Sequence, residues 1–257
     1  MIFAHPDDEV LWASSILKFS QQCIICFSES PGHQSISKGR EEAFKNFPIK
    51  KVTNLKLQEI GRIGAINWRN PKLNEDGNYW EKHCLEYDAG FRMLYLNLKK
   101  VLSKGDVVIT HNPWGEYGHE EHILVFNVVE KLSKEVGFKV FVTGYVSNRS
   151  IYLMHKTKQA ILRKPLTYKI DKNLINLLVP HYKQYEIWTW WDNYKWPNYE
   201  SFFALSERYD VEETIHSASE GLNHILFNEH NISFKDIMKF FLKNNVIKLK
   251  QWFNDKM

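Results

Sequence analysis

A short stretch near the start of the sequence gathers side chains that could bind a metal ion. Residues 5–9 read HPDDE, which sets one imidazole and three carboxylates around a proline. His5 and Asp8 are three residues apart, so on a first helical turn their side chains would share one face. Acidic residues are also common at helix starts, where they offset the exposed amides and the helix dipole. The stretch alone therefore leaves two interpretations, half of a metal site or an ordinary helix start.

A second stretch supplies the further ligands that a catalytic metal needs. Such a metal typically takes three protein ligands and keeps one position open for water. Residues 111–122 contain His111, His119 and His122, and the last two are again three residues apart. Two histidines and one aspartate would leave one position free, and bound Zn²⁺ would lower the pKa of its water to about 7. The spacing leaves open which histidine of the second stretch completes the set.

The remaining polar residues of the two stretches suggest an acid–base reaction. Asp7 lies beside Asp8 without the spacing to share its face, and we expect it to act as general base toward a metal-bound water. A protonated His119 could stabilise an oxyanion or protonate a leaving nitrogen, and Tyr117 could donate a hydrogen bond to the same oxyanion. We expect no catalytic role for four neighbouring residues. Glu9, Glu120 and Glu121 should be solvated carboxylates in the first turns of their helices, and His111 should shape the loop at the end of its strand.

The elements that must position these residues alternate along the first half of the chain. Strands are expected over residues 1–4, 23–27, 50–57, 106–111 and 139–146, and helices over 7–21, 40–47, 85–105 and 119–137. That order predicts an α/β fold with a mainly parallel sheet flanked by helices. Ligand sites in such sheets form at the carboxyl ends of the strands, in the loops that lead to the next helix. Both stretches fall at such junctions, so we expect them to meet at one edge of the sheet.

Two sequence blocks resemble a known family. AHPDDE at residues 4–9 and YGHEEH at residues 117–122 are similar to the A-H-P-D-D-E and G-H-x-x-H signatures of the PIG-L (LmbE-like) metal-dependent N-deacetylases. The resemblance implies a Rossmann-like fold, and it extends in element order to about Val146. It implies that the metal, usually Zn²⁺ although Fe²⁺ can serve, is bound by His5, Asp8 and His122. The further roles that it implies are Asp7 as general base, His119 as the group that stabilises the transition state, and Tyr117 as an assisting group at the carbonyl.

The resemblance also implies a substrate class. The family acts mostly on N-acetylated amino sugars and their conjugates, so we expect a small-molecule N-acetyl amino sugar, nucleotide-linked or lipid-linked as alternatives. GREEAF at residues 39–44 is similar to the family's arginine-led helix, which implies substrate binding by Arg40. The chain departs from the usual pattern there, because Glu41 and Glu42 follow the arginine at once. Trp12 stands where many members have a small residue, so we expect a differently shaped site mouth.

Composition sets the wider context. The 257 residues suffice for one large α/β domain, expected over residues 1–257, and the 44% hydrophobic and 25% charged residues are typical of soluble globular proteins. The net charge of +4 permits an anionic substrate and does not indicate nucleic-acid binding. No apolar run reaches about 18 residues and no signal peptide appears, which predicts a cytoplasmic protein without a transmembrane segment. Cys23 and Cys26 lie in an apolar run, and we expect them to be core thiols.

The second half of the chain, from about residue 150, has a less regular pattern. Residues 181–203 are rich in Trp and Tyr, and we expect an aromatic-rich extension over the site edge in which most rings pack and one or two reach the site mouth. Residues 233–253 begin with the capping pattern Ser233-x-x-Asp236 and predict a helix. Packing on the domain or on a second subunit is the favoured interpretation of this basic aromatic helix, and contact with a membrane is the alternative.

The leading hypothesis is thus a zinc-dependent N-acetyl amino sugar deacetylase, and two rival functions stay open. Two histidines and a carboxylate also form the facial triad of non-haem Fe(II) oxygenases, and His5-x-Asp7 has the spacing used there. Those enzymes carry the triad on a double-stranded β-helix, whereas this sequence alternates strands and helices. The other rival is a non-catalytic glycan-binding module of the same fold.

Overall fold

The fold is taken from a computed structural model, which describes residues 1–61, 67–68, 70–75, 77–79, 85–157, 161, 165–205 and 221–226. Contacts divide the chain into two units, Met1–Ile225 and Leu226–Met257. The second unit lies outside the described residues except for Leu226, and so does the helix expected over residues 233–253. The prediction of a single domain over residues 1–257 stays a prediction.

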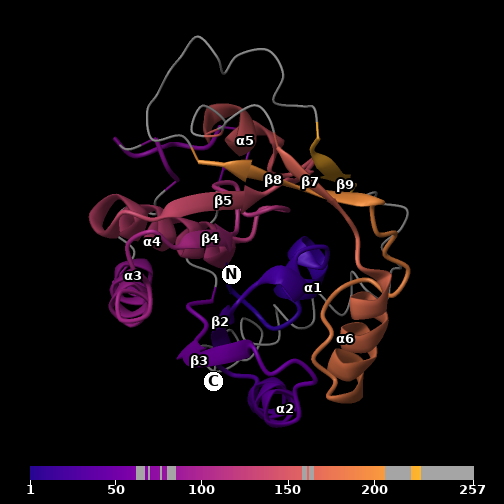
Figure 1. Cartoon of the computed structure of the whole chain (residues 1–257). Coiled ribbons are helices and arrows are strands. Elements are labelled where there is room, and N and C mark those ends of the chain that lie inside the picture. Colours follow the sequence, from indigo (N-terminus) through magenta and orange to yellow (C-terminus); the bar gives the residue numbers. More distant parts are fainter. Residues whose placement is uncertain are drawn as a thin grey trace, which may run out of the picture. The chain divides into compact units, whose positions relative to one another are not determined.

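A mainly parallel sheet forms the centre of the first unit (Figure 1). Among the described residues its strand order is β3-β2-β1-β4-β5-β8-β7. The parallel strands are β1 (Ile2–Phe3), β2 (Cys23–Glu29), β3 (Val52–Gln58), β4 (Val107–Thr110) and β5 (Lys139–Thr143). Two antiparallel strands extend this sheet, β8 (Tyr199–Ala204) and β7 (Leu166–Lys169). The predicted α/β class with a mainly parallel sheet is confirmed.

Helices flank the sheet, as expected (Figure 1). They are α1 (Asp8–Ala13), α2 (Gln34–Lys45), α3 (Leu85–Leu98), α4 (Glu120–Val136), α5 (Ile151–Thr157) and α6 (Lys172–Gln184). A 3₁₀ turn spans Leu17–Phe19, and β6 (Tyr145–Ser147) pairs in parallel with β9 (Asn223–Ile225) apart from the main sheet. None of the described helices is both long enough and apolar enough to span a bilayer.

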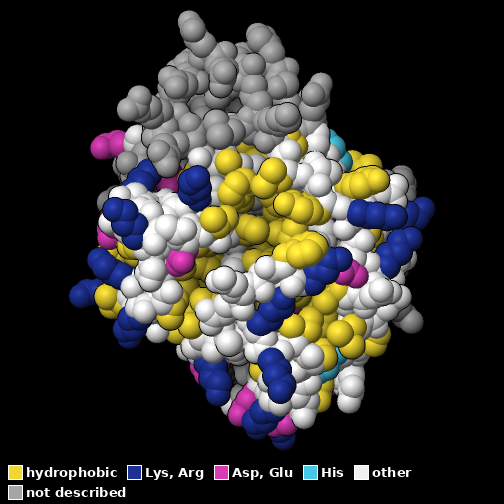
Figure 2. Space-filling view, viewed as in Figure 1, with side chains coloured by type: hydrophobic (Ala, Val, Ile, Leu, Met, Phe, Trp, Pro, Cys, Tyr) yellow, Lys and Arg dark blue, Asp and Glu magenta, His cyan; other side chains and the backbone are white. Residues whose placement is uncertain are grey.

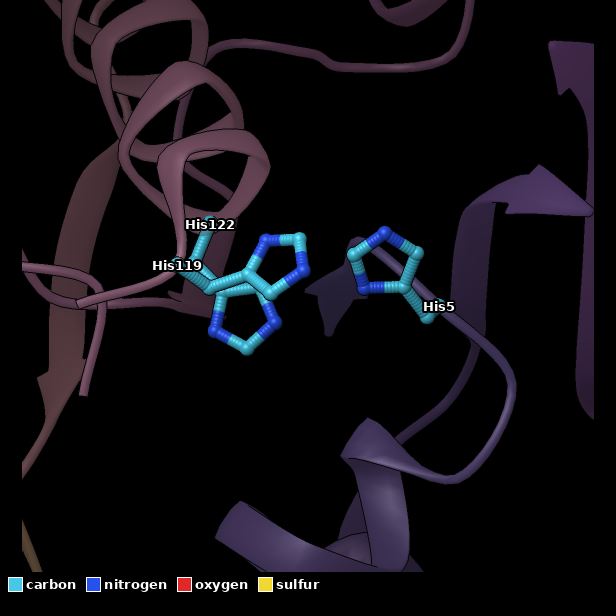
Figure 3. A group of neighbouring side chains, drawn as sticks. All are labelled: His5, His119 and His122. Carbon is cyan, nitrogen blue, oxygen red and sulfur yellow. The ribbon is translucent and has the colours of Figure 1, made fainter. Parts of the chain in front are cut away.

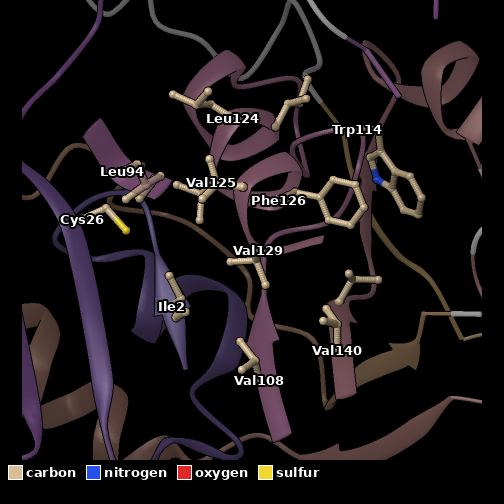
Figure 4. Packing of buried hydrophobic residues seen from close by; sticks show 14 of the residues in the cluster. Ile2, Cys26, Leu94, Val108, Trp114, Leu124, Val125, Phe126, Val129 and Val140 are labelled. Carbon is tan, nitrogen blue, oxygen red and sulfur yellow. The ribbon is translucent and has the colours of Figure 1, made fainter. Parts of the chain in front are cut away.

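Helix α4 is the centre of the hydrophobic core. Its side chains are buried without a break from Glu121 to Glu130. Val125, Phe126 and Val129 belong to the same buried cluster as residues of β1, β4 and β5 (Figure 4). Gly137 ends the helix in a left-handed conformation, as the sequence predicts. Because α4 is held along most of its length, the histidines at its first turn have a fixed position.

The order of the strands places the site. β1 lies between β2 and β4, so the chain connections turn to opposite sides of β1. In open α/β sheets ligands bind outside the carboxyl ends of the strands at such a switch point. His5 follows β1 and His111 follows β4 directly. The two sequence stretches therefore meet at the position where sheets of this kind bind ligands.

Several element boundaries differ from the prediction. The helix expected over residues 7–21 ends at Ala13 and gives way to the 3₁₀ turn, and the helix expected to reach residue 105 ends at Leu98. The helix expected over residues 40–47 begins earlier, at Gln34. The strand expected over residues 139–146 is broken at Gly144, where a Cβ atom would lie 2.8 Å from the Ser201 carbonyl oxygen. Close approach of β8 at this point thus requires glycine and ends β5.

The part of the chain after residue 150 is more regular than expected. It contains α6 and the antiparallel pair of β7 and β8. Asp171 caps α6 by accepting hydrogen bonds from the backbone N–H groups of Asn173 and Leu174. All four residues of β7 are exposed, so the strand lacks the apolar run by which buried strands are recognised. Cys23 and Cys26 are buried free thiols, as expected, and burial raises the pKa of both.

Candidate metal centre

Asp8 lies in the middle of the site, and its side chain fixes the conformation of the surrounding turn by hydrogen bonds. Its Oδ2 accepts the backbone N–H of His5 at 2.7 Å, and its Oδ1 accepts the indole N–H of Trp12 at 2.8 Å. The Asp8 side chain is buried at the first turn of α1. The first stretch is therefore held in place by its own aspartate, directly after the two residues of β1.

Two histidines are each held by a buried carboxylate. His122 Nδ1 lies 2.7 Å from Glu116 Oε2, and His5 Nε2 lies 2.7 Å from Glu121 Oε2. An imidazole that donates one N–H to a carboxylate keeps a lone pair on its other nitrogen, an arrangement usual for metal-binding histidines. The second nitrogens are His5 Nδ1 and His122 Nε2. Burial alone would lower the pKa of His5, but hydrogen bonds to Asp8 and Glu121 raise it to about 10, so a metal would bind His5 Nδ1 in place of a proton.

Asp8 lies between these two nitrogens. Its Oδ2 is 3.4 Å from His5 Nδ1, and its Oδ1 is 3.3 Å from His122 Nε2. His122 Nε2 is buried and has no hydrogen-bond partner among the described residues. Buried polar atoms of native proteins are nearly always satisfied by a partner, water or an ion. The orphaned nitrogen and the two-nitrogen, one-carboxylate donor set both fit a divalent metal.

The described part of the chain contains three groups of side chains whose ligand atoms lie within 4.8 Å of one another. They are His5/His119/His122, Asp8/His111/His122 and His5/Glu59/Glu121. The predicted trio of His5, Asp8 and His122 takes two members from each of the first two groups. Figure 3 shows His5 on one side, facing His119 and His122 at the start of α4. The residues predicted from the two stretches are thus brought together.

His111 lies beside Asp8, with Nε2 3.4 Å from Asp8 Oδ2, but both of its ring nitrogens have other hydrogen-bond partners. Its Nε2 accepts the backbone N–H of Ala4 at 2.9 Å, and its Nδ1 lies 3.0 Å from Glu116 Oε2. The first bond uses the Nε2 lone pair and requires the proton on Nδ1. The geometry therefore agrees with the expected structural role, since His111 ties the end of β4 to the end of β1.

Glu116 is a site residue that the sequence reasoning missed. It is fully buried in the loop before α4, and its backbone is left-handed at φ 50°. Its carboxylate bonds His111, His122, the Asn112 backbone N–H and the Thr143 hydroxyl. Burial alone would raise the pKa of Glu116, but the two imidazoles lower it to about 2. It is therefore ionised and can accept hydrogen bonds from both histidines.

Asp7 is held by the distant aromatic-rich segment. Its Oδ2 lies 3.1 Å from the Thr189 hydroxyl and 3.4 Å from the Thr189 backbone nitrogen, both of which donate. The backbone of Asp7 is left-handed at φ 94°, a conformation that Asp and Asn tolerate better than most residues. Burial, reinforced by the charges of Asp8 and Glu9, raises the pKa of Asp7 well above its usual range. A bound cation would oppose this rise.

The expectation of solvated carboxylates is wrong for Glu9 and Glu121, which are 0% and 3% exposed. Glu9 accepts hydrogen bonds from the Tyr182 hydroxyl at 2.5 Å and from the Asp7 backbone, and burial raises its pKa to about 7. Glu121 Oε1 accepts the backbone N–H of Ile60 at 2.5 Å, while Oε2 holds His5. These acids are buried because distant segments supply them with donors. Glu120 is half-buried.

His119 and Tyr117 both reach the cluster. His119 caps α4, and its Nδ1 accepts the backbone N–H of Glu121 at 3.3 Å. Burial and the charge of His122 lower the pKa of His119 well below its usual value, which favours the neutral ring with its proton on Nε2. The Tyr117 ring is 5.4 Å from the His122 ring and 5.7 Å from the His119 ring, centre to centre. Both residues can direct a hydrogen-bond donor toward the site.

Arg40 lies deeper than expected for a residue that binds substrate. Its guanidinium Nη1 donates to Glu59 Oε1 at 2.5 Å, and that oxygen is 4.0 Å from His5 Nε2. The Arg40 side chain is buried on α2. The structure therefore brings Arg40 to the site through Glu59, and its role in substrate binding stays a prediction.

The aromatic segment has one ring at the site and others on a separate groove. The Trp190 ring lies 5.0 Å from Tyr117 and 5.2 Å from Trp12, and it stacks on Trp191 at 4.8 Å. A groove of about 310 Å³ on α6 is lined by aromatic, apolar and charged residues, among them Trp188, Trp191, Tyr194, Trp196, Lys183 and Asp192. In Figure 2 hydrophobic side chains also gather over a broad area of the visible face. Trp12 is buried against Asp8, and the expectation of a differently shaped site mouth stays a prediction.

Comparison with known proteins finds a likeness at the level of structure. No family model and no curated protein matches the sequence, whereas seven chains of solved structures match. One is the crystal structure of a deacetylase–bog complex in the biosynthesis pathway of teicoplanin, with 9% identity, a TM-score of 0.51, and 80% of this chain and 97% of that chain covered. Another is a deacetylase–teicoplanin complex of the same pathway, with 9% identity, a TM-score of 0.49, and 79% and 96% covered. At this identity the likeness is one of fold.

Proposed function

We propose that the chain is a PIG-L (LmbE-like) N-deacetylase that uses a bound metal to hydrolyse the acetamide of an N-acetylated amino sugar or sugar conjugate. The observation that carries the proposal is the arrangement of His5, Asp8 and His122, with two carboxylate-held imidazoles turned toward one aspartate. The fold shared with a deacetylase of teicoplanin biosynthesis supports it. So do the two sequence blocks at residues 4–9 and 117–122.

In this proposal the metal is held by His5 Nδ1, Asp8 and His122 Nε2. When bound, a divalent metal such as Zn²⁺, or Fe²⁺, supplies a positive charge that polarises water and the amide carbonyl. Each imidazole donates a hydrogen bond to a carboxylate, which makes its other nitrogen a stronger base and a stronger metal ligand. Glu116 and Glu121 thereby take part in the site without touching the metal.

Asp7 carries the proton transfer in the proposed reaction. It accepts the proton of the water that attacks the amide carbonyl, and the Thr189 hydroxyl fixes the orientation of its carboxylate. His119 donates its Nε2–H and Tyr117 its hydroxyl to the oxyanion that forms at the carbonyl carbon. The nitrogen of the tetrahedral species then takes the proton held by Asp7, the C–N bond breaks, and acetate and the free amine are released. Arg40 remains the proposed contact for an anionic carrier on the sugar.

The experiment is acetate release from a panel of N-acetylated sugars, with and without diphosphate carriers, together with measurement of metal content. We expect at least one substrate to be hydrolysed in a metal-dependent manner. Asp7→Asn should keep the metal and lose most turnover, whereas His122→Ala should lose the metal. Asp88→Asn, a change of the same kind at an exposed position on α3, is the matched control and should leave both unchanged.

Three outcomes contradict parts of the proposal. Wild-type turnover in Asp7→Asn would remove the general base. Full metal content in His122→Ala would remove that residue from the ligand set. Absence of acetate release across the panel by metal-loaded protein would refute the deacetylase function and favour a binding module. The oxygenase alternative has no support in the fold, because the described sheet is mainly parallel and not a double-stranded β-helix.

A further inference from the structure

Trp12 occupies an unusual place for a tryptophan. It lies one helical turn after Asp8 on α1 and is 0% exposed. Its indole N–H donates to Asp8 Oδ1 at 2.8 Å. A buried indole normally finds an acceptor for its N–H, and most often that acceptor is backbone or water. Here the acceptor is a side chain proposed to bind the metal.

The bond completes the fixation of the Asp8 carboxylate. Each oxygen accepts one N–H, Oδ1 from Trp12 and Oδ2 from the His5 backbone. Histidine nitrogens also lie near both oxygens. Oδ1 is 3.3 Å from His122 Nε2, and Oδ2 is 3.4 Å from both His5 Nδ1 and His111 Nε2. With one donor on each side, the carboxylate cannot rotate about its Cβ–Cγ bond without breaking a buried hydrogen bond. Its orientation relative to the two imidazoles is thereby set before a metal arrives.

The indole is itself held on several sides. Its ring makes edge contacts with Tyr145 at 5.1 Å and Trp190 at 5.2 Å, and it lies 5.8 Å from Tyr117. Close packing restricts the rotamers of the ring, and release of the N–H would leave a buried donor unsatisfied. Breaking the hydrogen bond to Asp8 therefore costs free energy.

We propose that Trp12 is a positioning residue of the metal centre, which fixes the Asp8 carboxylate through its indole N–H and thereby raises the affinity of the site for a divalent metal. The inference rests on one part of the proposed function, namely that Asp8 is a metal ligand. Hydrogen-bond partners of metal ligands typically contribute 10- to 100-fold to metal affinity. Trp12 acts on the metal only through Asp8.

The test is a Co²⁺ titration of the metal-free full-length protein, followed by visible absorption. Trp12→Phe keeps an aromatic ring and removes the N–H, and we expect Co²⁺ to bind about 10- to 100-fold more weakly, with a changed visible spectrum. The matched control is Trp114→Phe. Trp114 is 1% exposed and donates its indole N–H to the Tyr145 carbonyl at 2.6 Å, so the control loses a bond of the same kind away from Asp8. Its Co²⁺ affinity and spectrum should match those of the wild type.

A second measurement needs no substitution. Addition of Zn²⁺ to ¹⁵N-labelled wild-type protein should shift one indole N–H resonance strongly, because the charge on its acceptor oxygen changes when Asp8 binds the metal. The proposal is overturned if no indole resonance shifts, if Trp12→Phe binds Co²⁺ as the wild type does, or if Trp114→Phe loses as much affinity. Absence of acetate release with an intact Trp12 effect would refute the deacetylase function and leave this inference standing.

Discussion

Replacing Glu116 with glutamine tests whether the metal centre depends on the carboxylate behind it. Oε2 of Glu116 faces the Nδ1 atoms of His111 and His122 at 3.0 and 2.7 Å. Oε1 accepts the Asn112 backbone N–H at 3.2 Å and the Thr143 hydroxyl. Glutamine has nearly the same shape and the same cost in a left-handed backbone, so the substitution changes the hydrogen bonds and removes the negative charge with little change in packing.

The glutamine amide has one oxygen for a site that presents donors on both sides. If the oxygen faces the histidines, the NH₂ group meets the Asn112 N–H, and a buried donor is left unsatisfied at a cost of about 1–3 kcal/mol. If the NH₂ group faces the histidines, His122 must carry its proton on Nε2 and loses the lone pair proposed to bind metal. His111 cannot make the same change, because its Nε2 accepts the Ala4 N–H. Metal affinity should fall about 10- to 100-fold, or about 1.4–2.8 kcal/mol.

The assay combines a Zn²⁺ titration against a chelator with urea unfolding of the metal-free protein. Glu130→Gln is the matched control, because Glu130 is a buried carboxylate on the same helix α4 that pairs with Lys134 at 3.0 Å, away from the site. We expect the control to bind Zn²⁺ as the wild type does. Wild-type Zn²⁺ affinity in Glu116→Gln would refute the reasoning that the carboxylate selects the His122 tautomer that leaves Nε2 free.

Two further substitutions test other parts of the argument. Thr189→Val removes the hydroxyl that donates to Asp7 Oδ2 and keeps the side-chain volume, so kcat should fall about 2- to 10-fold with unchanged metal content; an unchanged kcat would remove Thr189 from the site. Phe126→Ala opens a cavity in the core under α4 and should lower the free energy of unfolding by about 3–5 kcal/mol in urea denaturation. Val107→Ala, at a position 60% exposed, is its control, and equal losses in the two variants would contradict the placement of the core.

The fold class could be predicted because apolar strands and helical patterns alternate in the first half of the chain. The run at residues 23–27 is buried throughout in the sheet, as parallel strands require. The meeting of the two stretches followed from the same rule, since β1 and β4 are neighbours and present their carboxyl ends at one edge. The antiparallel extension could not be predicted in this way, because β7 is exposed along its length and carries no buried apolar run.

The contacts of the predicted site residues with distant side chains could not be predicted from the spacing of residues in the sequence. Glu9 was expected to be solvated, but Tyr182, 173 residues along the chain, supplies its donor. Thr189 is 182 residues from Asp7 in the sequence and donates a hydrogen bond to its carboxylate. It lies in a tryptophan-rich segment whose composition does not indicate a polar contact of this kind. Glu116 follows no recognisable motif, although its place between a strand and a histidine pair could have drawn attention to it. Short motifs identify ligand candidates, whereas their partners come from the tertiary fold.

The distances along the chain between bonded site residues also set the order in which the site can form. His5 and Glu121 are 116 residues apart, and Asp7 and Thr189 are 182 apart. Contacts between distant residues form slowly, because a large loop must close before they stabilise the chain. During synthesis the amino-terminal part folds first. All proposed metal ligands are present once His122 has been made, and the threonine that orients Asp7 follows later. A nascent chain of this protein should therefore gain the ability to bind metal before it gains the ability to use it.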